Sequence, residues 1–511
     1  MASTIDFDPS AKDQSWIHSL PILDDAQAGS LRRIHELAAQ LPDDWSGMMG
    51  QSTLQEDFGS LRFQLAYMSY ALAVTHVHRL PAAPVAFHGA FNSLIQKMLS
   101  PDVWMYWHYV STGKGPFNKS LGDLPAEWDP VVKDNIMYSA YIQSMALLYH
   151  YLFRDDRYAA PGALTFSINS LFWGEGGKHF AYDERSLNQH LYWGMAERGF
   201  LGIACEPNCV FQICNQVPIW GFRFHDLVYG GDVAKEVTDG YLKAWREFGG
   251  VLTPDGHFNM MVLELERTVI SPPERPWVDF WMGALMHAWN PELVERQYPT
   301  LLRSWLMDGP DGTLCIKPVP PIDGEGPPIP SPHDFGWAAV LASEVGDSGT
   351  LRGLLAYADR FLHPVRSNGS YYYRRHDEPY DDQGRSTIMD PHTGNVLLPF
   401  ARLNVKDGLR KLFDGPWDSR HFGEPALVHT SRPLDIRRAY FSPDKNALAL
   451  TLLPIEGGAV RMTIANAVNR GNVSLTRNGV RADDAVSIQG DQLLMDLEIA
   501  ESTNLVLSWP C

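Results

Sequence analysis

Between about residue 60 and residue 416, apolar residues recur at positions i, i+3, i+4 and i+7, the spacing that places them on one face of a helix. Clusters of Gly, Pro and Asp separate these segments and mark loops. A long series of helices joined by short loops predicts helix hairpins closed into an α/α6 barrel, a toroid, with an open solenoid as the alternative. The segments predicted to be helical are residues 61–78, 87–99, 130–153, 160–172, 208–228, 233–248, 278–289, 292–307, 335–345, 350–362 and 395–412.

The pattern changes at two later points in the chain. Residues 308–332 are rich in Pro and Gly, which predicts a long ordered loop or lid. After Trp417 the apolar period shortens toward 2, and Asn478-Gly479 is typical of a hairpin turn between two strands. We therefore expect a mainly α protein in three parts, which are an N-terminal extension (residues 1–50), an α/α barrel (residues 51–417) and a small C-terminal β-sandwich-like domain (residues 425–511).

Composition and charge narrow the classes of partner. A hydrophobic fraction of 45% supports a large core, and a formal net charge of −18 argues against nucleic acid and anionic membranes as partners. The first residues lack the basic and apolar regions of a secretory signal, and no apolar run approaches the length of a membrane span. Five cysteines without regular spacing do not form a disulfide framework. We expect a cytoplasmic protein, with a homo-oligomer left open.

Three of the five cysteines lie within residues 199–215. Pro207 fits the first turn of a helix, which would place Cys205 at the helix N-terminus, where the dipole favours a thiolate. Cys214 could then share a site with Cys205 only if Cys205 precedes the helix. The alternative is core packing, which we expect for Cys209, because free cysteines are usually buried as small hydrophobes. The Cys spacing does not match structural zinc, and we predict no metal site.

Several sequence elements resemble the linalool dehydratase-isomerase family, a cofactor-independent group of α/α6 barrels that act on terpene alcohols. They occur in the order of the family and are residues 65–70, Val103-Trp104 with Trp107, residues 134–138, Gly202 to Pro207 with Phe211 and Cys214-Asn215, Pro276-Trp277, and residues 281–291. The resemblance implies that Cys205 and Cys214 are the two active-site cysteines. It also implies that Met137, Phe211 and Trp277 line an apolar pocket.

Other positions depart from the family pattern. The catalytic aspartate of the family aligns with Leu72, its tyrosine with His78 and its histidine with Tyr141. The resemblance therefore implies His78 and Tyr141 as an altered proton-transfer pair, while satisfied core polar groups are the alternative.

Three further residues are candidates for the pocket. Glu206 is either a helix cap or an acid/base residue, since a carboxylate is favoured at a helix N-terminus. Trp104 and Trp107 form either an aromatic wall that stabilises a cationic carbon or ordinary core packing.

These observations favour an enzyme that isomerises, dehydrates or cyclises a small apolar, terpenoid-like substrate by acid/base steps in a dry pocket. We expect no cofactor, because the chain has no Asp-Asp-x-x-Asp run, no Gly-rich nucleotide loop and no His-Glu-x-x-His motif. Three alternatives remain open. They are a shape-directed pericyclic cyclase, a carbohydrate-active toroid that uses paired carboxylates such as Asp279 and Glu206, and a binding protein without catalysis.

Overall fold

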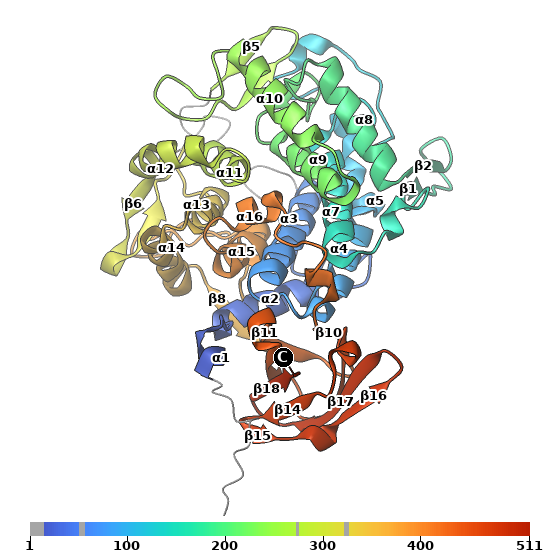
Figure 1. Ribbon diagram of the computed structural model, residues 1–511. Coiled ribbons are helices and arrows are strands. Elements are labelled where there is room, and N and C mark those ends of the chain that lie inside the picture. The colour runs from blue at the N-terminus through green and yellow to red at the C-terminus, as the bar shows by residue number, and fades with distance from the viewer. Residues whose placement is uncertain (1–14, 51–56, 272–274, 321–326, 511) are drawn as a thin grey trace, which may run out of the picture.

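The computed structural model describes residues 15–50, 57–271, 275–320 and 327–510. A ring of contacting helices forms the larger part of the molecule (Figure 1). Each ring helix contacts the next, and the last contacts the first. In order, the ring helices are α3 (Asp57–His78), α7 (Ile136–Phe153), α9 (Gln216–Tyr229), α11 (Pro276–Met286), α13 (Pro332–Val345) and α15 (Leu398–Leu403).

A second set of helices packs on the outside of this ring. Each contacts one or two ring helices and leaves its other face to solvent. These helices are α2 (Asp25–Ala38), α4 (His88–Met98), α8 (Glu184–Glu197), α10 (Val233–Arg246), α12 (Pro291–Trp305), α14 (Ser348–Phe361) and α16 (Gly408–Asp414).

The sequences of the two sets explain the two layers. In the ring helix α7, nearly every side chain is apolar or small and is buried, as expected for a helix surrounded by protein. In the outer helix α10, burial is restricted to one stripe of Ala234, Val237, Tyr241, Ala244 and Trp245. The predicted helical segments cover the outer helices α4, α10, α12 and α14 and include all six ring helices, whereas α2 and α8 were not predicted.

Part of the predicted N-terminal extension belongs to the helical core. Asp24 caps α2 in a reciprocal capping box with Gln27. The helix buries Leu31, Ile34 and Leu37 and contacts the ring helix α15. Residues 1–14 of the predicted extension lie outside the described residues.

Two helix predictions were wrong in type. Residues 160–172 contain the strand β1 (Leu164–Ile168), which pairs with β2 (Lys178–Tyr182), because Leu164 and Phe166 are buried with a period of 2. Residues 208–215 form a turn and the strand β3 (Cys209–Phe211), which pairs with β4 (Met261–Leu263); β4 in turn pairs with β5 (Thr268–Ile270). The helix α9 begins only at Gln216.

Two other predicted segments are interrupted. The strand β6 (Leu306–Asp308) follows α12 directly and pairs with β7 (Leu314–Ile316) across the start of the predicted loop. Further along that loop, Val319 and Ile329 form an isolated β-bridge, while residues 321–326 lie outside the described residues. Residues 395–412 divide into α15 and α16, because Asp407 adopts a left-handed backbone conformation between them (φ +57°).

The C-terminal region consists of two antiparallel sheets. In β17 (Gln492–Ile499), alternate residues such as Leu493, Met495 and Leu497 are buried, as the shorter period predicts. In β12 (Ala447–Pro454), every residue from Ala447 to Leu452 is buried, because this strand is covered on both faces. Positive φ angles at Asn478 and Gly479 form the predicted hairpin turn between β14 and β15. The first sheet has the order β10 (Ala426–Thr430), β13 (Gly458–Ala465), β17 (Gln492–Ile499), β16 (Val486–Gln489), and the second the order β11 (Leu434–Ser442), β12 (Ala447–Pro454), β18 (Thr503–Ser508), β14 (Ser474–Arg477), β15 (Val480–Arg481).

Hydrogen bonds connect the β region to the last residue of α3 and to the loop that follows this helix (Figure 1). The backbone N–H of Leu427 donates to the carbonyl oxygen of Ala82 (2.8 Å), and the hydroxyl of Tyr440 donates to the carbonyl oxygen of His78 (2.8 Å). The prediction of a mainly helical chain followed by a sheet-rich region is therefore confirmed. Among the described residues, none of the helices combines the length and apolarity needed to cross a membrane.

Candidate functional site

The cysteine-rich segment lines a cavity of about 460 Å³ at the N-terminal ends of the ring helices. Such a volume lies in the range of small-molecule sites, and the lining is mostly apolar with a few polar groups. The wall receives residues from the start of α3, α7 and α11 and from the segment that precedes α9. We call this space the cysteine cavity. Its lining residues are Arg62, Phe63, Gly115, Pro116, Phe117, Asn118, Met137, Cys205, Glu206, Cys209, Phe211, Ile213, Cys214, Met260, Ile270, Arg275, Trp277 and Trp281.

A tight turn, not a helix start, positions Cys205. The N–H of Cys209 donates to the carbonyl oxygen of Glu206 (2.9 Å), with Pro207 and Asn208 between them. Asn208 has φ +73°, so the turn has the features of type II, in which Pro precedes a residue with positive φ. The N–H of Cys205 then donates to the carbonyl oxygen of Cys209 (2.9 Å). The expected helix dipole at Cys205 is therefore absent, because Pro207 occupies a turn.

Asn215 joins the two cysteine-bearing stretches. Its side-chain oxygen accepts from the N–H of Ile203 (2.8 Å), and its amide nitrogen donates to the carbonyl oxygens of Ile203 (3.0 Å) and Phe211 (2.8 Å). Gly202 has φ +134°, and a Cβ there would lie 2.5 Å from the Asn215 side chain. The backbone around Cys205 and Cys214 is thus held in one arrangement by a fully buried amide.

We expect Asn215→Ala to destabilise the protein by roughly 3 kcal/mol, because buried backbone groups at Ile203 and Phe211 lose their partner. Chemical denaturation would measure this loss as a lower free energy of unfolding, with an m-value equal to that of the parent. Asn118→Ala is the matched control, since the side chain of Asn118 donates only one long hydrogen bond (3.5 Å). Equal stability of the two variants would contradict the role of Asn215.

Three ionisable side chains form a row on the cavity wall. Cys205 is followed directly by Glu206 and lowers the pKa of its carboxyl group, and it raises the pKa of the Cys214 thiol. The sulfur of Cys214 lies 3.9 Å from the sulfur of Met137. Burial is the larger cause that raises the pKa of Cys214, so this thiol stays protonated. The row of Glu206, Cys205 and Cys214 can therefore carry a proton along the wall.

Glu206 combines burial with a nearby positive charge. Burial raises the pKa of its carboxyl group above the usual 4.5, while the Arg62 guanidinium and the Cys205 thiol act in the opposite direction. Arg62 is itself only 1% exposed, and its guanidinium carbon lies 4.3 Å from the ring centre of Phe63 and 4.2 Å from that of Tyr106. The mostly apolar cavity thus contains a carboxyl group that can be charged, with Arg62 as a positive neighbour.

An aromatic wall faces the thiols. Trp281 contacts Phe63 edge to face (5.5 Å between ring centres) and stacks on Trp337 (4.9 Å) behind it. The indole N–H of Trp281 donates to the hydroxyl oxygen of Tyr67 (2.6 Å), which also accepts from the hydroxyl of Tyr141 (3.3 Å). Such π faces stabilise nearby positive charge.

A buried group of histidines and aspartates lies behind this wall. The ring of His333 is 5.1 Å from Trp281, and the ring of His392 stacks on Phe63 at 5.9 Å. Burial lowers the pKa of both imidazoles, that of His392 to about 3, and raises the pKa of Asp334 to about 7. One oxygen of Asp334 accepts from the backbone N–H of Trp277 (2.8 Å), so it fixes the entry of α11.

The structure brings together most of the predicted pocket residues. Six of the residues singled out from the sequence line the cysteine cavity, and these are Cys205, Cys214, Met137, Phe211, Trp277 and Glu206.

The predicted His78–Tyr141 pair is not formed. His78 is the last residue of α3, about 24 Å along the helix from Arg62 at 1.5 Å per residue, and its Nε2 lies 2.9 Å from the carbonyl oxygen of Gly408. Tyr141 lies behind the aromatic wall against Tyr67. Leu72 is buried in the core partway along α3, likewise away from the cavity. The length of α3 separates His78 from the cavity, and Tyr141 lies on another helix, α7.

Trp104, Trp107 and Asp279, which the sequence analysis considered for the site, lie outside the lining of the cysteine cavity. The indole N–H of Trp104 donates to the carbonyl oxygen of Leu99 (3.1 Å), and both Trp104 and Trp107 are buried outside the cavity lining. Asp279 accepts from the backbone N–H of Phe258 (2.8 Å) and pairs with His257 (2.7 Å). Asp279 therefore does not face Glu206 as a second carboxylate.

Sequence reasoning missed Arg62, Phe63, Trp281 and the His333–His392 group. Arg62 gave a weak signal, as a lone charge in an apolar helical run. The two histidines gave no signal in the sequence, because they lie about 60 residues apart and meet only in the folded chain.

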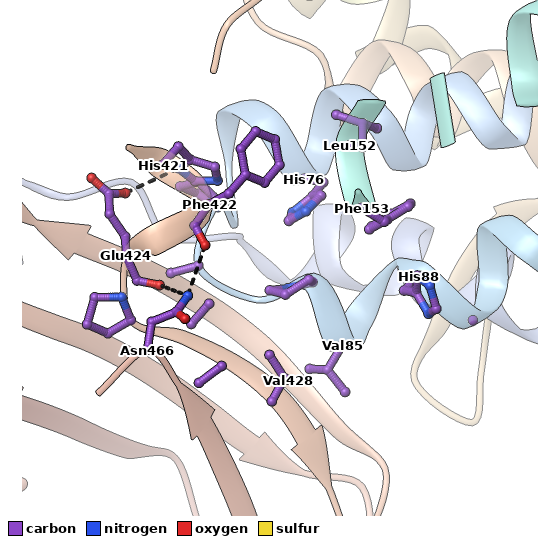
Figure 2. Close-up of a pocket in the computed structure, with 17 residues that line it drawn as sticks. His76, Val85, His88, Leu152, Phe153, His421, Phe422, Glu424, Val428 and Asn466 are labelled. Atoms are coloured by element: carbon purple, nitrogen blue, oxygen red, sulfur yellow. Dashed lines mark hydrogen bonds and ion pairs between the residues drawn. The ribbon is translucent and has the colours of Figure 1, made fainter. Parts of the chain in front are cut away.

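A second cavity of about 410 Å³ lies between the helices and the β region. Figure 2 shows His76, Leu152 and Phe153 from the helices, Val428 from β10, and Asn466, which directly follows β13, around this cavity. The ring of His76 stacks on Phe87 (4.6 Å), and burial lowers its pKa to about 3. The lining of this cavity includes His76, His88, His421 and Glu424 but no thiol, so the thiols single out the cysteine cavity as the candidate site.

Fold and site together define a mainly helical protein with a row of thiols and a carboxyl group in an apolar cavity. The sequence model of the linalool dehydratase/isomerase family matches residues 62–379, and the chain belongs to this family. All lining residues of the cysteine cavity fall within the matched segment. The resemblance inferred from sequence elements is thus confirmed.

The solved structures that match this chain are distant from it in sequence. An α-amylase from Clostridium perfringens is 11% identical with a TM-score of 0.41, and the match covers 75% of this chain and 99% of that one. A GH76 α-mannanase from Bacteroides thetaiotaomicron is 11% identical with a TM-score of 0.40, covering 75% and 95% of the two chains. Endoglucanase CelQ from Clostridium thermocellum is 9% identical with a TM-score of 0.38, covering 95% and 92%.

Proposed function

We propose that this protein is an acid/base lyase or isomerase that dehydrates a small terpenoid-like alcohol, or shifts its hydroxyl group, in the cysteine cavity of an α/α6 barrel. The observation that carries the proposal is the row of Glu206, Cys205 and Cys214 in an apolar, aromatic cavity of a chain from the linalool dehydratase/isomerase family. The proposed proton transfers use only the two thiols and the carboxyl group of this row.

The row provides a balanced proton circuit. The Cys214 thiol, kept protonated by burial, donates its proton to the substrate hydroxyl, and the C–O bond breaks to release water. Cys205 then passes its proton to Cys214. The Cys205 thiolate then takes a proton from the carbon next to the cationic centre, which forms the C=C bond. Substrate loses one water, and both thiols return to their starting state.

The other cavity residues support this circuit. The ionised Glu206 carboxylate accepts from Cys205 and holds the proton-transfer geometry, and Arg62 favours the ionised form. Trp277, Trp281 and Phe63 place π faces against the cationic carbon. The exclusion of water by these rings protects the cation from capture and strengthens each polar interaction.

A panel of acyclic terpenoid alcohols and their alkenes, incubated with purified protein and followed by gas chromatography and mass spectrometry, tests the proposal. We expect conversion of an alcohol to an alkene or to a positional isomer. Turnover of an oligosaccharide panel instead would favour the carbohydrate alternative. Tight binding of a terpenoid that is returned unchanged would favour the binding protein.

A further inference from the structure

A second group of polar residues lies at the end of the helical ring opposite the cysteine cavity. His287 directly follows α11, Glu295 lies in α12 and Asp407 directly precedes α16. The cavity residue Trp277 lies at the start of α11, so the two sites occupy opposite ends of this helix. One ligand atom from each of His287, Glu295 and Asp407 lies within 4.8 Å of the others. We call these three residues the histidine–carboxylate cluster.

The orientation of the His287 ring is fixed from behind by Glu344 of α13. Glu344 is fully buried, and one of its oxygens lies 3.2 Å from Nδ1 of His287. The same carboxylate accepts from the side-chain amide of Asn404 (3.0 Å) and from the backbone N–H of Leu409 (2.9 Å). A carboxylate held in this way accepts from Nδ1–H and leaves the lone pair of Nε2 pointing away from it. Histidines that bind metals usually have such a carboxylate on their other nitrogen.

Nε2 of His287 points into the gap between the two other members of the cluster. It lies 3.5 Å from Oε1 of Glu295 and 4.0 Å from Oδ1 of Asp407. Among the described residues, Nε2 of His287 and Oδ1 of Asp407 are buried without a hydrogen-bond partner, although Nη1 of Arg410 lies 4.0 Å from the Asp407 oxygen. The His287 ring is 0% exposed. A buried imidazole nitrogen whose nearest carboxylate lies beyond hydrogen-bond distance needs an explanation.

The separations match a shared metal ion better than direct hydrogen bonds. N–H to O hydrogen bonds span about 2.7–3.2 Å between heavy atoms, which is shorter than both separations. Two ligands of a tetrahedral ion with bonds of about 2.1 Å lie about 3.4 Å apart. The side chain of Glu295 is 52% exposed, so an ion could enter from solvent on that side.

We propose that His287, Glu295 and Asp407 bind one divalent transition-metal ion, for which Zn²⁺ is the probe, and that this ion ties α11, α12 and the start of α16 together. Nitrogen and carboxylate oxygen ligands suit Zn²⁺, with solvent as the fourth ligand. The site is separate from the cysteines, whose spacing gave no zinc prediction. A failure of the proposed dehydration in the cysteine cavity leaves this proposal unaffected.

Isothermal titration of the full-length, chelator-treated and untagged protein with Zn²⁺ tests the site. Because cavity thiols also bind zinc, the comparison uses Glu295→Gln and the matched variant Glu292→Gln, an exposed residue in the same helix. We expect the parent and Glu292→Gln to bind Zn²⁺ equally at one common site. We expect Glu295→Gln to bind it at least about tenfold more weakly at that site.

Two results would overturn the metal site. One is unchanged Zn²⁺ affinity in Glu295→Gln, which would assign the binding to the thiols. The other is the absence of binding in the parent, which would leave the cluster as an imidazolium surrounded by carboxylates. Glu295 is half exposed, so its replacement should leave the fold intact, and circular dichroism of both variants checks this.

Discussion

Cys205→Ala is expected to lower turnover of the terpenoid-like substrate by roughly 10²-fold or more, the usual scale for a positioned acid or base. Cys205 is the middle member of the row, and it affects the pKa of both Glu206 and Cys214. Its removal interrupts proton return to Cys214 and also removes the group that takes the proton from carbon. The substrate KM should change much less than kcat, because the apolar wall that binds the substrate remains.

Cys209→Ala is the matched control for this variant. Cys209 lies four residues further along the chain and lines the same cavity, but the row passes from Glu206 through Cys205 to Cys214 without it. We expect its kcat to remain within a few-fold of the parent. A large and equal loss of kcat in both variants would show that damage to the segment, rather than loss of the row, lowers turnover.

Glu206→Gln is expected to lower kcat by about 10²-fold and to remove the acidic limb of the pH profile. Burial raises the pKa of Glu206 above 4.5, and the proposed role needs the ionised carboxylate. Activity should therefore fall as pH decreases through the raised pKa, at a higher pH than for an ordinary glutamate. The amide of Gln has no proton to gain, so the variant should be slow and flat over that range.

A plot of kcat against pH for the parent and Glu206→Gln provides the measurement. Substitution of Glu197, an exposed glutamate on α8, by Gln should leave the acidic limb in place. The proposed role of Glu206 fails if the acidic limb persists unchanged in Glu206→Gln, since another group would then titrate.

Sequence reasoning located the helices well where burial leaves a strong local pattern. The continuous apolar run of α7 and the stripe of α10 each give an unambiguous period. The segment at residues 160–172 misled because its apolar residues fit both periods over a short length, and the tertiary pairing of β1 with β2 decides between them. The helix α8 has a capping Asp183 and buried residues four apart, a signal that was present and missed.

In the candidate site, too, the sequence indicates local features but not those that depend on tertiary contacts. The cysteine segment was found from its residues, but Pro207 fits both a helix start and the second position of a turn, and sequence alone does not separate them. The His78 prediction failed because its position along α3 determines which end of the ring it reaches. His333 and His392 come together only through the closure of the ring, which leaves no local trace in the sequence.

The most direct test of the central claim is the hydration of the product alkene in D₂O, the reverse of the proposed elimination. The account predicts an alcohol with one deuterium on carbon, delivered through the thiol row, and a rate that falls about 10²-fold in Cys205→Ala but not in Cys209→Ala. A product without carbon-bound deuterium, such as a shape-directed cyclisation would give, or the same rate of labelling in Cys205→Ala, would contradict it.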